Sequence, residues 1–99
     1  MADTRLEAAL DIARERLSAI SEGDVDRLTG TLRPHERACA ALAGLRDSSD
    51  PADIQALGEL IALEQQTSKL LDEAVAEAGA QLANLRTGEK TAAAYRAVL

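Results

Sequence analysis

The stretch that decides the fold is DPADIQALGELIALEQQTSKLLDEAVAEAGAQLANLRTG, residues 50–88. Its start carries a clear helix signal, because Asp50 can cap the first amides and Pro51 suits the first helical position. Apolar residues then recur at alternating steps of three and four, which is the spacing of one helix face. We call this set the apolar stripe: Ile54, Leu57, Ile61, Leu71, Val75, Ala78, Leu82 and Leu85. A long helix is therefore predicted over residues 51–86, ended by Gly88.

A first helix is expected over residues 4–22, upstream of this stretch. Thr4 and Glu7 have the spacing of a capping box, in which the hydroxyl and the carboxylate each accept from an amide at the helix start. Gly23 follows at the position where a left-handed residue commonly ends a helix. The apolar positions again step by three and four: Leu6, Leu10, Ala13, Leu17 and Ile20.

A second helix is expected over residues 24–46, where Asp24 can cap the first turn. Pro34 interrupts this segment, because it has no amide hydrogen and its ring crowds the carbonyl of Gly30. The helix should therefore kink or break near Pro34. Its inward positions still keep the helical period: Val25, Leu28, Leu32, His35, Cys39 and Leu42.

A short C-terminal helix is predicted over residues 89–97, and it carries Tyr95, the only aromatic residue. At ~1.5 Å per residue, the helix over 51–86 is about 54 Å long and the helix over 24–46 about 35 Å. Short connections make successive helices antiparallel, so the longest helix should pair with the second one to around residue 73 and then project beyond it.

The projecting end of the longest helix offers a candidate surface for a partner. With no neighbour there, the apolar stripe must be covered by the C-terminal helix folding back, by a second copy, or by a partner helix. A terminal helix that covers the stripe could also be displaced from it. The candidate partner-binding residues are Leu71, Val75, Ala78, Leu82, Leu85 and Tyr95.

The composition narrows the classes of function. The chain has 99 residues, enough for one helical-bundle domain over 1–99, so the fold class is all-α. Its net charge of −6 argues against nucleic acid as a partner, because phosphate binding needs clustered Lys and Arg. No apolar run approaches the ~20 residues that cross a bilayer, so membrane insertion is not expected. Cys39 is the single cysteine, which agrees with a reducing cytoplasm.

A metal or catalytic site could be drawn from His35, Cys39 and Glu64. The first two lie four residues apart on one helix, and Glu64 interrupts the apolar stripe on the facing helix. Zinc sites need three or four protein ligands with supporting contacts. A catalytic nucleophile needs groups that bind the oxyanion, and the sequence contains no motif for such groups. We therefore expect that the protein binds no cofactor and has no enzymatic activity. Glu64 and Ser68 more simply form a polar layer that fixes helix register, or point outward.

Three stretches carry a resemblance to a known family: GDVDRL at 23–28, LGELIALEQQ at 57–66, and LRTGEKTAAAY at 85–95. Together they are similar to the flagellar export chaperones of the FliT and FlgN type. The short chain resembles the FliT proteins more than the longer FlgN proteins. Two departures are Pro34 within the second helix and the short ending after Tyr95, which leaves little room for a separate regulatory helix.

The resemblance implies a cytoplasmic chaperone of flagellar type III protein export. Such a protein would bind the C-terminal helical region of a filament-cap or hook-associated protein and prevent its premature assembly. It would also deliver that subunit to components of the export apparatus, and some members contact a transcription factor. The alternative is a homodimeric helical protein in which two projecting ends pair with each other and no chaperone role exists.

Overall fold

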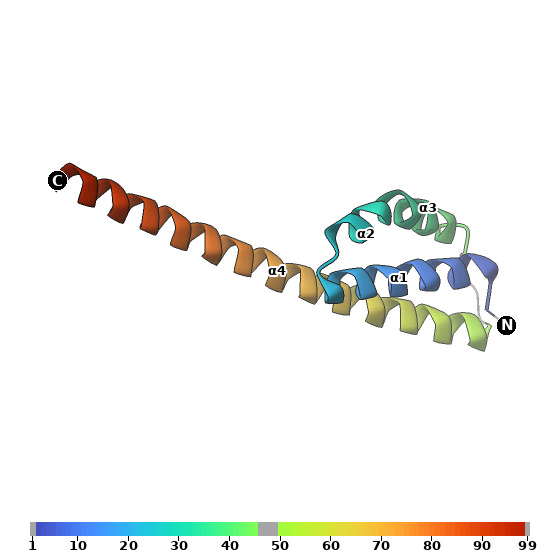
Figure 1. The fold of residues 1–99 in the computed structure, drawn as a ribbon. Helices are drawn as coiled ribbons and strands as arrows, with labels where there is room; N and C mark the ends of the chain where they lie inside the picture. Colours follow the sequence, from blue (N-terminus) through green and yellow to red (C-terminus); the bar gives the residue numbers. More distant parts are fainter. Residues whose placement is uncertain (1, 46–49, 99) are drawn as a thin grey trace.

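The computed structural model describes residues 2–45 and 50–98, with the backbone alone at 91, 94, 95 and 98. The described residues form helices without strands, which confirms the all-α prediction (Figure 1). In chain order the helices are α1 (Thr4–Glu22), α2 (Val25–Gly30), α3 (Leu32–Leu42) and α4 (Pro51–Val98). None of the described helices is long and apolar enough to cross a membrane.

The helices form a small bundle at one end of a long rod. Figure 1 shows α1 and α4 running side by side in the same direction, while α2 and α3 return along α1. The N-terminal ends of α1 and α4 meet where the amide of Asp3 donates to Oδ1 of Asp53 at 2.7 Å. The molecule measures 73 × 21 × 20 Å, and its long dimension matches the about 72 Å expected for the 48 residues of α4.

The core lies between α1 and α4. Small alanines at three buried positions let the two helices approach closely, and leucines fill the space between them. The buried cluster consists of Leu6, Ala9, Leu10, Ala13, Ala56 and Leu60. We predicted that the longest helix would pair with the second one, but α4 packs along α1 and meets α3 through the longer side chains of His35 and Glu64.

The ends of α1 follow the sequence signals with one correction. Gly23 ends the helix in the left-handed conformation, at φ 69°, as expected. The N-cap, however, is Asp3 and not Thr4. The Asp3 carboxylate accepts from the amide of Arg5 at 2.8 Å and is held by the Arg5 guanidinium, so it caps the helix one residue earlier than the hydroxyl would.

The predicted interruption of the second helix is confirmed. Thr31 separates α2 from α3, three residues before Pro34, because the proline cannot bond to the carbonyl of Gly30 and crowds it. The Thr31 hydroxyl donates to the carbonyl of Leu28 at 2.6 Å, which satisfies one of the carbonyls left over at the end of α2. α3 ends at Leu42, short of the predicted residue 46, which lies outside the described residues.

The prediction of a separate C-terminal helix over 89–97 is wrong. α4 continues through Gly88 to Val98 as one helix (Figure 1). A helix interior tolerates a glycine at a cost of about 1 kcal/mol, and the residues around Gly88 are mostly strong helix formers. Gly23 is the described glycine with positive φ, so Gly88 does not adopt the left-handed geometry that ends a helix.

Candidate partner-binding surface

α4 has two apolar faces, and α1 covers one of them. Ala56, Leu60 and Thr67 are buried against the bundle, and Leu63 packs at its edge. These residues are spaced by four, three and four, as expected for one side of a helix. The face that supports the fold is therefore adjacent to the apolar stripe rather than identical with it.

The apolar stripe lies mainly in solvent along the whole length of α4. Within the bundle it was expected to form part of the core, yet Ile54, Leu57 and Ile61 are 46–58% exposed. Only Leu71, where α4 leaves the bundle, is half-buried among its members. The stripe thus forms two exposed apolar stretches, one on the bundle and one beyond it, with Glu64 and Ser68 between them.

Beyond Leu71 the helix has no neighbour within the described chain. We call residues 72–98 the overhang; they extend about 40 Å from the bundle. Every side chain of the overhang that the structure describes is exposed. Val75 is 71%, Leu82 48% and Leu85 66% exposed, which is unusual for large aliphatic side chains on one helix face.

The structure places five of the six predicted partner-binding residues on one face of α4. Leu71, Val75, Ala78, Leu82 and Leu85 follow one another at steps of four and three. The sixth, Tyr95, lies ten residues beyond Leu85, so its backbone is about 15 Å further along the helix axis. A C-terminal segment folded back over the stripe is therefore not what the chain adopts.

A shallow apolar depression lies on the overhang near its tip. It is lined by Gln81, Asn84, Leu85, Gly88, Glu89 and Ala92. Gly88 has no side chain, and a Cβ built there meets no other atom within 4 Å, so space is left beside Leu85. Gly88 was predicted to end the helix, and its place in this depression was not predicted, although the spacing 81, 85, 88 and 92 marks one face.

The His35, Cys39 and Glu64 cluster joins α3 to α4. Nε2 of His35 lies 2.9 Å from Oε1 of Glu64, and Sγ of Cys39 lies 3.7 Å from the same nitrogen. The described residues contain no group of three or more His, Cys, Asp or Glu side chains placed to hold a metal ion. The geometry fits the reading of Glu64 as a polar position that fixes how the helices align.

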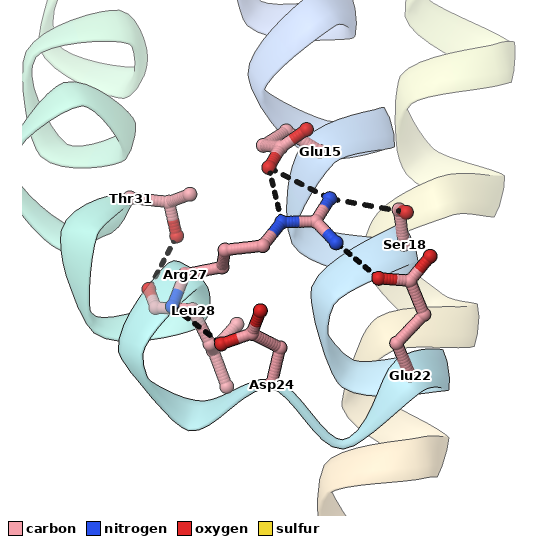
Figure 2. A network of polar contacts seen from close by, with 7 residues as sticks. All are labelled: Glu15, Ser18, Glu22, Asp24, Arg27, Leu28 and Thr31. Carbon is pink, nitrogen blue, oxygen red and sulfur yellow. Dashed lines mark hydrogen bonds and ion pairs between the residues drawn. The ribbon is translucent and has the colours of Figure 1, made fainter.

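A second polar network, which was not predicted from the sequence, fixes the turn between α1 and α2. Figure 2 shows the Arg27 guanidinium between Glu15, Ser18 and Glu22 of α1. Its Nε donates to Glu15 Oε1 at 2.9 Å, and this hydrogen bond raises the pKa of Arg27. Asp24 caps α2 by accepting from the amide of Arg27 at 3.1 Å, as predicted.

This network aligns α2 with the end of α1 and leaves the overhang untouched. Exposed ion pairs contribute little singly, but several on one guanidinium restrict its position. The molecule therefore has a bundle braced at its turn and a projecting helix whose described side chains are all exposed.

Comparison with known proteins identifies the family. A family model described as "Flagellar protein FliT" matches residues 3–97, which is nearly the whole chain. No curated protein and no solved structure matches the chain. The match includes the bundle and most of the overhang, so the exposed stripe lies within the family's own region. The chain therefore belongs to the FliT family of flagellar proteins.

Proposed function

We propose that this protein binds the C-terminal helical region of a filament-cap or hook-associated protein along the apolar stripe of α4. FliT family membership implies the role of a flagellar export chaperone. In the proposed mechanism, the chaperone holds that subunit in the cytoplasm and prevents its early assembly. It then delivers the subunit to the export apparatus. A chaperone of this kind performs no chemistry, so the protein needs no cofactor.

The observation that supports this function best is the exposed stripe on the overhang. The exposure of Val75, Leu82 and Leu85 to water is unfavourable. An amphipathic helix of a partner can cover all three side chains at once. The seven-residue spacing of Val75 and Leu82 suits side-by-side packing with one helix.

The free energy gained by burying these three side chains indicates how far along the stripe the contact with the client must extend. Full burial of a Val or Leu side chain contributes about 1.5–3 kcal/mol, and these three are already partly covered. Together they offer about 3–6 kcal/mol, which is close to the minimum association cost of about 4 kcal/mol. A stable complex therefore needs further contacts, and Leu57 and Ile61 on the same stripe can supply them.

The charge of the chaperone would favour clients with basic flanking residues. The chain carries a net charge of −6, so a basic segment would approach it faster at low salt. The same charge also reduces nonspecific association between copies of the chaperone. Apolar burial would then provide the affinity once the client helix has docked.

Co-expression with candidate cap and hook-associated subunits tests the proposal. Changing Leu82 and Leu85 together to Asp should abolish retention of the client, because two charges would face its apolar side. The matched control changes Ala80 and Ala83 to Asp, which adds the same charges to other faces of the same turns. Retention by the control and loss by the stripe variant is expected. Equal retention by both variants would show that the client binds elsewhere.

A further inference from the structure

The apolar stripe has a defined length on the overhang. From Ile54 to Leu85 its positions follow a seven-residue repeat with alternating steps of three and four, which is the spacing of a coiled-coil seam. Ser68 occupies the position of this repeat that precedes Leu71, and Glu89 occupies the position that follows Leu85. The uninterrupted apolar seam therefore runs from Leu71 to Leu85, a length of about 21 Å, and suits two repeats of one partner helix.

Two opposite charges lie beside this seam on the same flank. Asp72 follows Leu71 and Arg86 follows Leu85, so the two side chains occupy equivalent positions two repeats apart. Both are exposed, and neither has an ion-pair partner within the residues that the structure describes. A partner helix on the seam therefore meets a negative charge near the bundle and a positive charge toward the tip.

Gly79 lies midway between the two charges, at the equivalent position of the repeat between them. A Cβ built on Gly79 meets no atom within 4 Å, so the space beside the seam is open there. A partner helix can place a large side chain against this part of α4. The flank thus presents, one repeat apart, an acidic residue, an open space and a basic residue.

We infer that the client helix lies antiparallel to α4 on the overhang, in a register set by Asp72 and Arg86. Equivalent flanking positions of two antiparallel helices face each other across the seam. The client helix then carries an acidic residue opposite Arg86, a large residue opposite Gly79 and a basic residue opposite Asp72, in this order along its chain and one repeat apart. This inference rests on the proposed function and specifies the chemistry of the client.

The helix dipole favours the antiparallel direction. Acidic residues stabilise a helix near its N-terminal end, and basic residues stabilise it near its C-terminal end. A client helix with this distribution complements the overhang only when it is antiparallel, because its acidic beginning then faces Arg86 and its basic end faces Asp72. A parallel arrangement would bring like charges together. The charges therefore select direction and register, while burial of the apolar seam provides most of the affinity.

Two synthetic peptides of one composition test the inference. Both form a helix with leucine at the seam positions. The first carries Glu early and Lys two repeats later on the same flank, and the second exchanges these two residues. Fluorescence anisotropy at low salt should show that the wild-type protein binds the first peptide at least about threefold more tightly. The variant D72R/R86D should prefer the second peptide, and this inversion separates charge pairing from the intrinsic helicity of the peptides.

The matched control is the variant E73R/K90D. It makes the same two charge reversals at positions of the repeat that turn away from the seam, so it should keep the wild-type preference for the first peptide. Equal binding of both peptides by the wild type and by D72R/R86D would overturn the charge pairing. A preference that the control also inverts would overturn it too, because net charge alone would then explain the result.

A spin label on the first residue of the first peptide determines the direction of binding. It should broaden the NMR signals around Arg86 and leave those around Asp72 sharp, and the opposite pattern would overturn the antiparallel arrangement. Failure of this inference can be distinguished from failure of the proposed function. If changing Leu82 and Leu85 to Asp abolishes client retention while neither peptide is preferred, the inference is wrong and the proposed function stands. Retention of the client by that variant would contradict the proposed function itself.

Discussion

Nε2 of His35 lies 2.9 Å from Oε1 of Glu64, and this contact ties α3 to α4 where the apolar stripe is interrupted. The two side chains are 25% and 38% exposed, so the contact is only partly screened by water. It lies within the bundle, about two helical turns before the overhang begins at residue 72. The polar interruption of the stripe therefore stabilises the fold, and we propose that the apolar remainder binds a partner.

Glu64→Ala should lower the free energy of unfolding by about 1 kcal/mol, because His35 loses its hydrogen-bond partner between two helices. Urea denaturation followed by circular dichroism measures the change. The neighbouring exposed Gln65→Ala should change stability by less than about 0.5 kcal/mol. Equal losses in both variants would mean that the His35 contact contributes nothing beyond helix propensity.

The stability that Asp3 provides should depend on pH. Its hydrogen bonds with the Arg5 side chain and amide lower the pKa of the Asp3 carboxyl from 3.8 to about 2. Because the folded-state pKa is depressed, the stabilisation is present above pH 3.8 and is lost as pH falls toward 2. The Tm of Asp3→Asn should therefore lie below that of the wild type at neutral pH, and the gap should close at acidic pH. A gap that stays constant down to pH 2 would contradict the Arg5 pairing, and Asp11→Asn serves as the exposed control.

Leucines on the two faces of α4 should respond differently to truncation. Leu60→Ala should cost about 2–5 kcal/mol, because Leu60 is 7% exposed between α1 and α4. Leu82→Ala should cost less than about 0.5 kcal/mol at protein concentrations where the chain is monomeric, because Leu82 projects from the overhang. Chemical denaturation of both variants checks this contrast. A comparable loss at Leu82 would mean that the chain itself covers the overhang.

Gly88→Ala should strengthen the end of α4 by about 0.5–1 kcal/mol, because alanine is the better helix former and the added Cβ meets no neighbour. Amide hydrogen exchange by NMR should show slower exchange over the last turns of the helix. Gly23→Ala should instead destabilise the end of α1, because Gly23 has a φ of 69°, which alanine adopts only with strain. Faster exchange in Gly88→Ala would instead indicate that Gly88 breaks the helix.

Local signals in the sequence predicted where the three main helices begin and where α1 ends. The caps at Gly23, Asp24 and Asp50 and the interruption before Pro34 depend on residues close in the chain. The end at Gly88 could not be decided in this way. A glycine ends a helix only where a left-handed conformation has a lower free energy than continuation of the helix. At Gly88 the neighbouring helix-forming residues favour continuation.

The packing face of α4 could not be derived from its periodicity alone. Leu60 and Ile61 belong to two adjoining apolar faces with similar spacing, and only the shape of α1 decides between them. The sequence predicted Leu71, Val75, Ala78, Leu82 and Leu85 on one face of the helix, and the structure places these five so. That they bind a partner stays a prediction. The Arg27 network depends on contacts between residues five to twelve positions apart, which have no simple sequence signal.

The most direct test of the proposed function is hydrogen–deuterium exchange of the overhang in the presence of the C-terminal segment of each candidate cap or hook-associated subunit. An unpartnered helix end exchanges quickly, and a bound client helix should slow exchange over residues 72–88 while α1 stays unchanged. Protection confined to α1, α2 and α3 by a segment that binds would contradict the proposal that the apolar stripe of α4 is the client-binding surface.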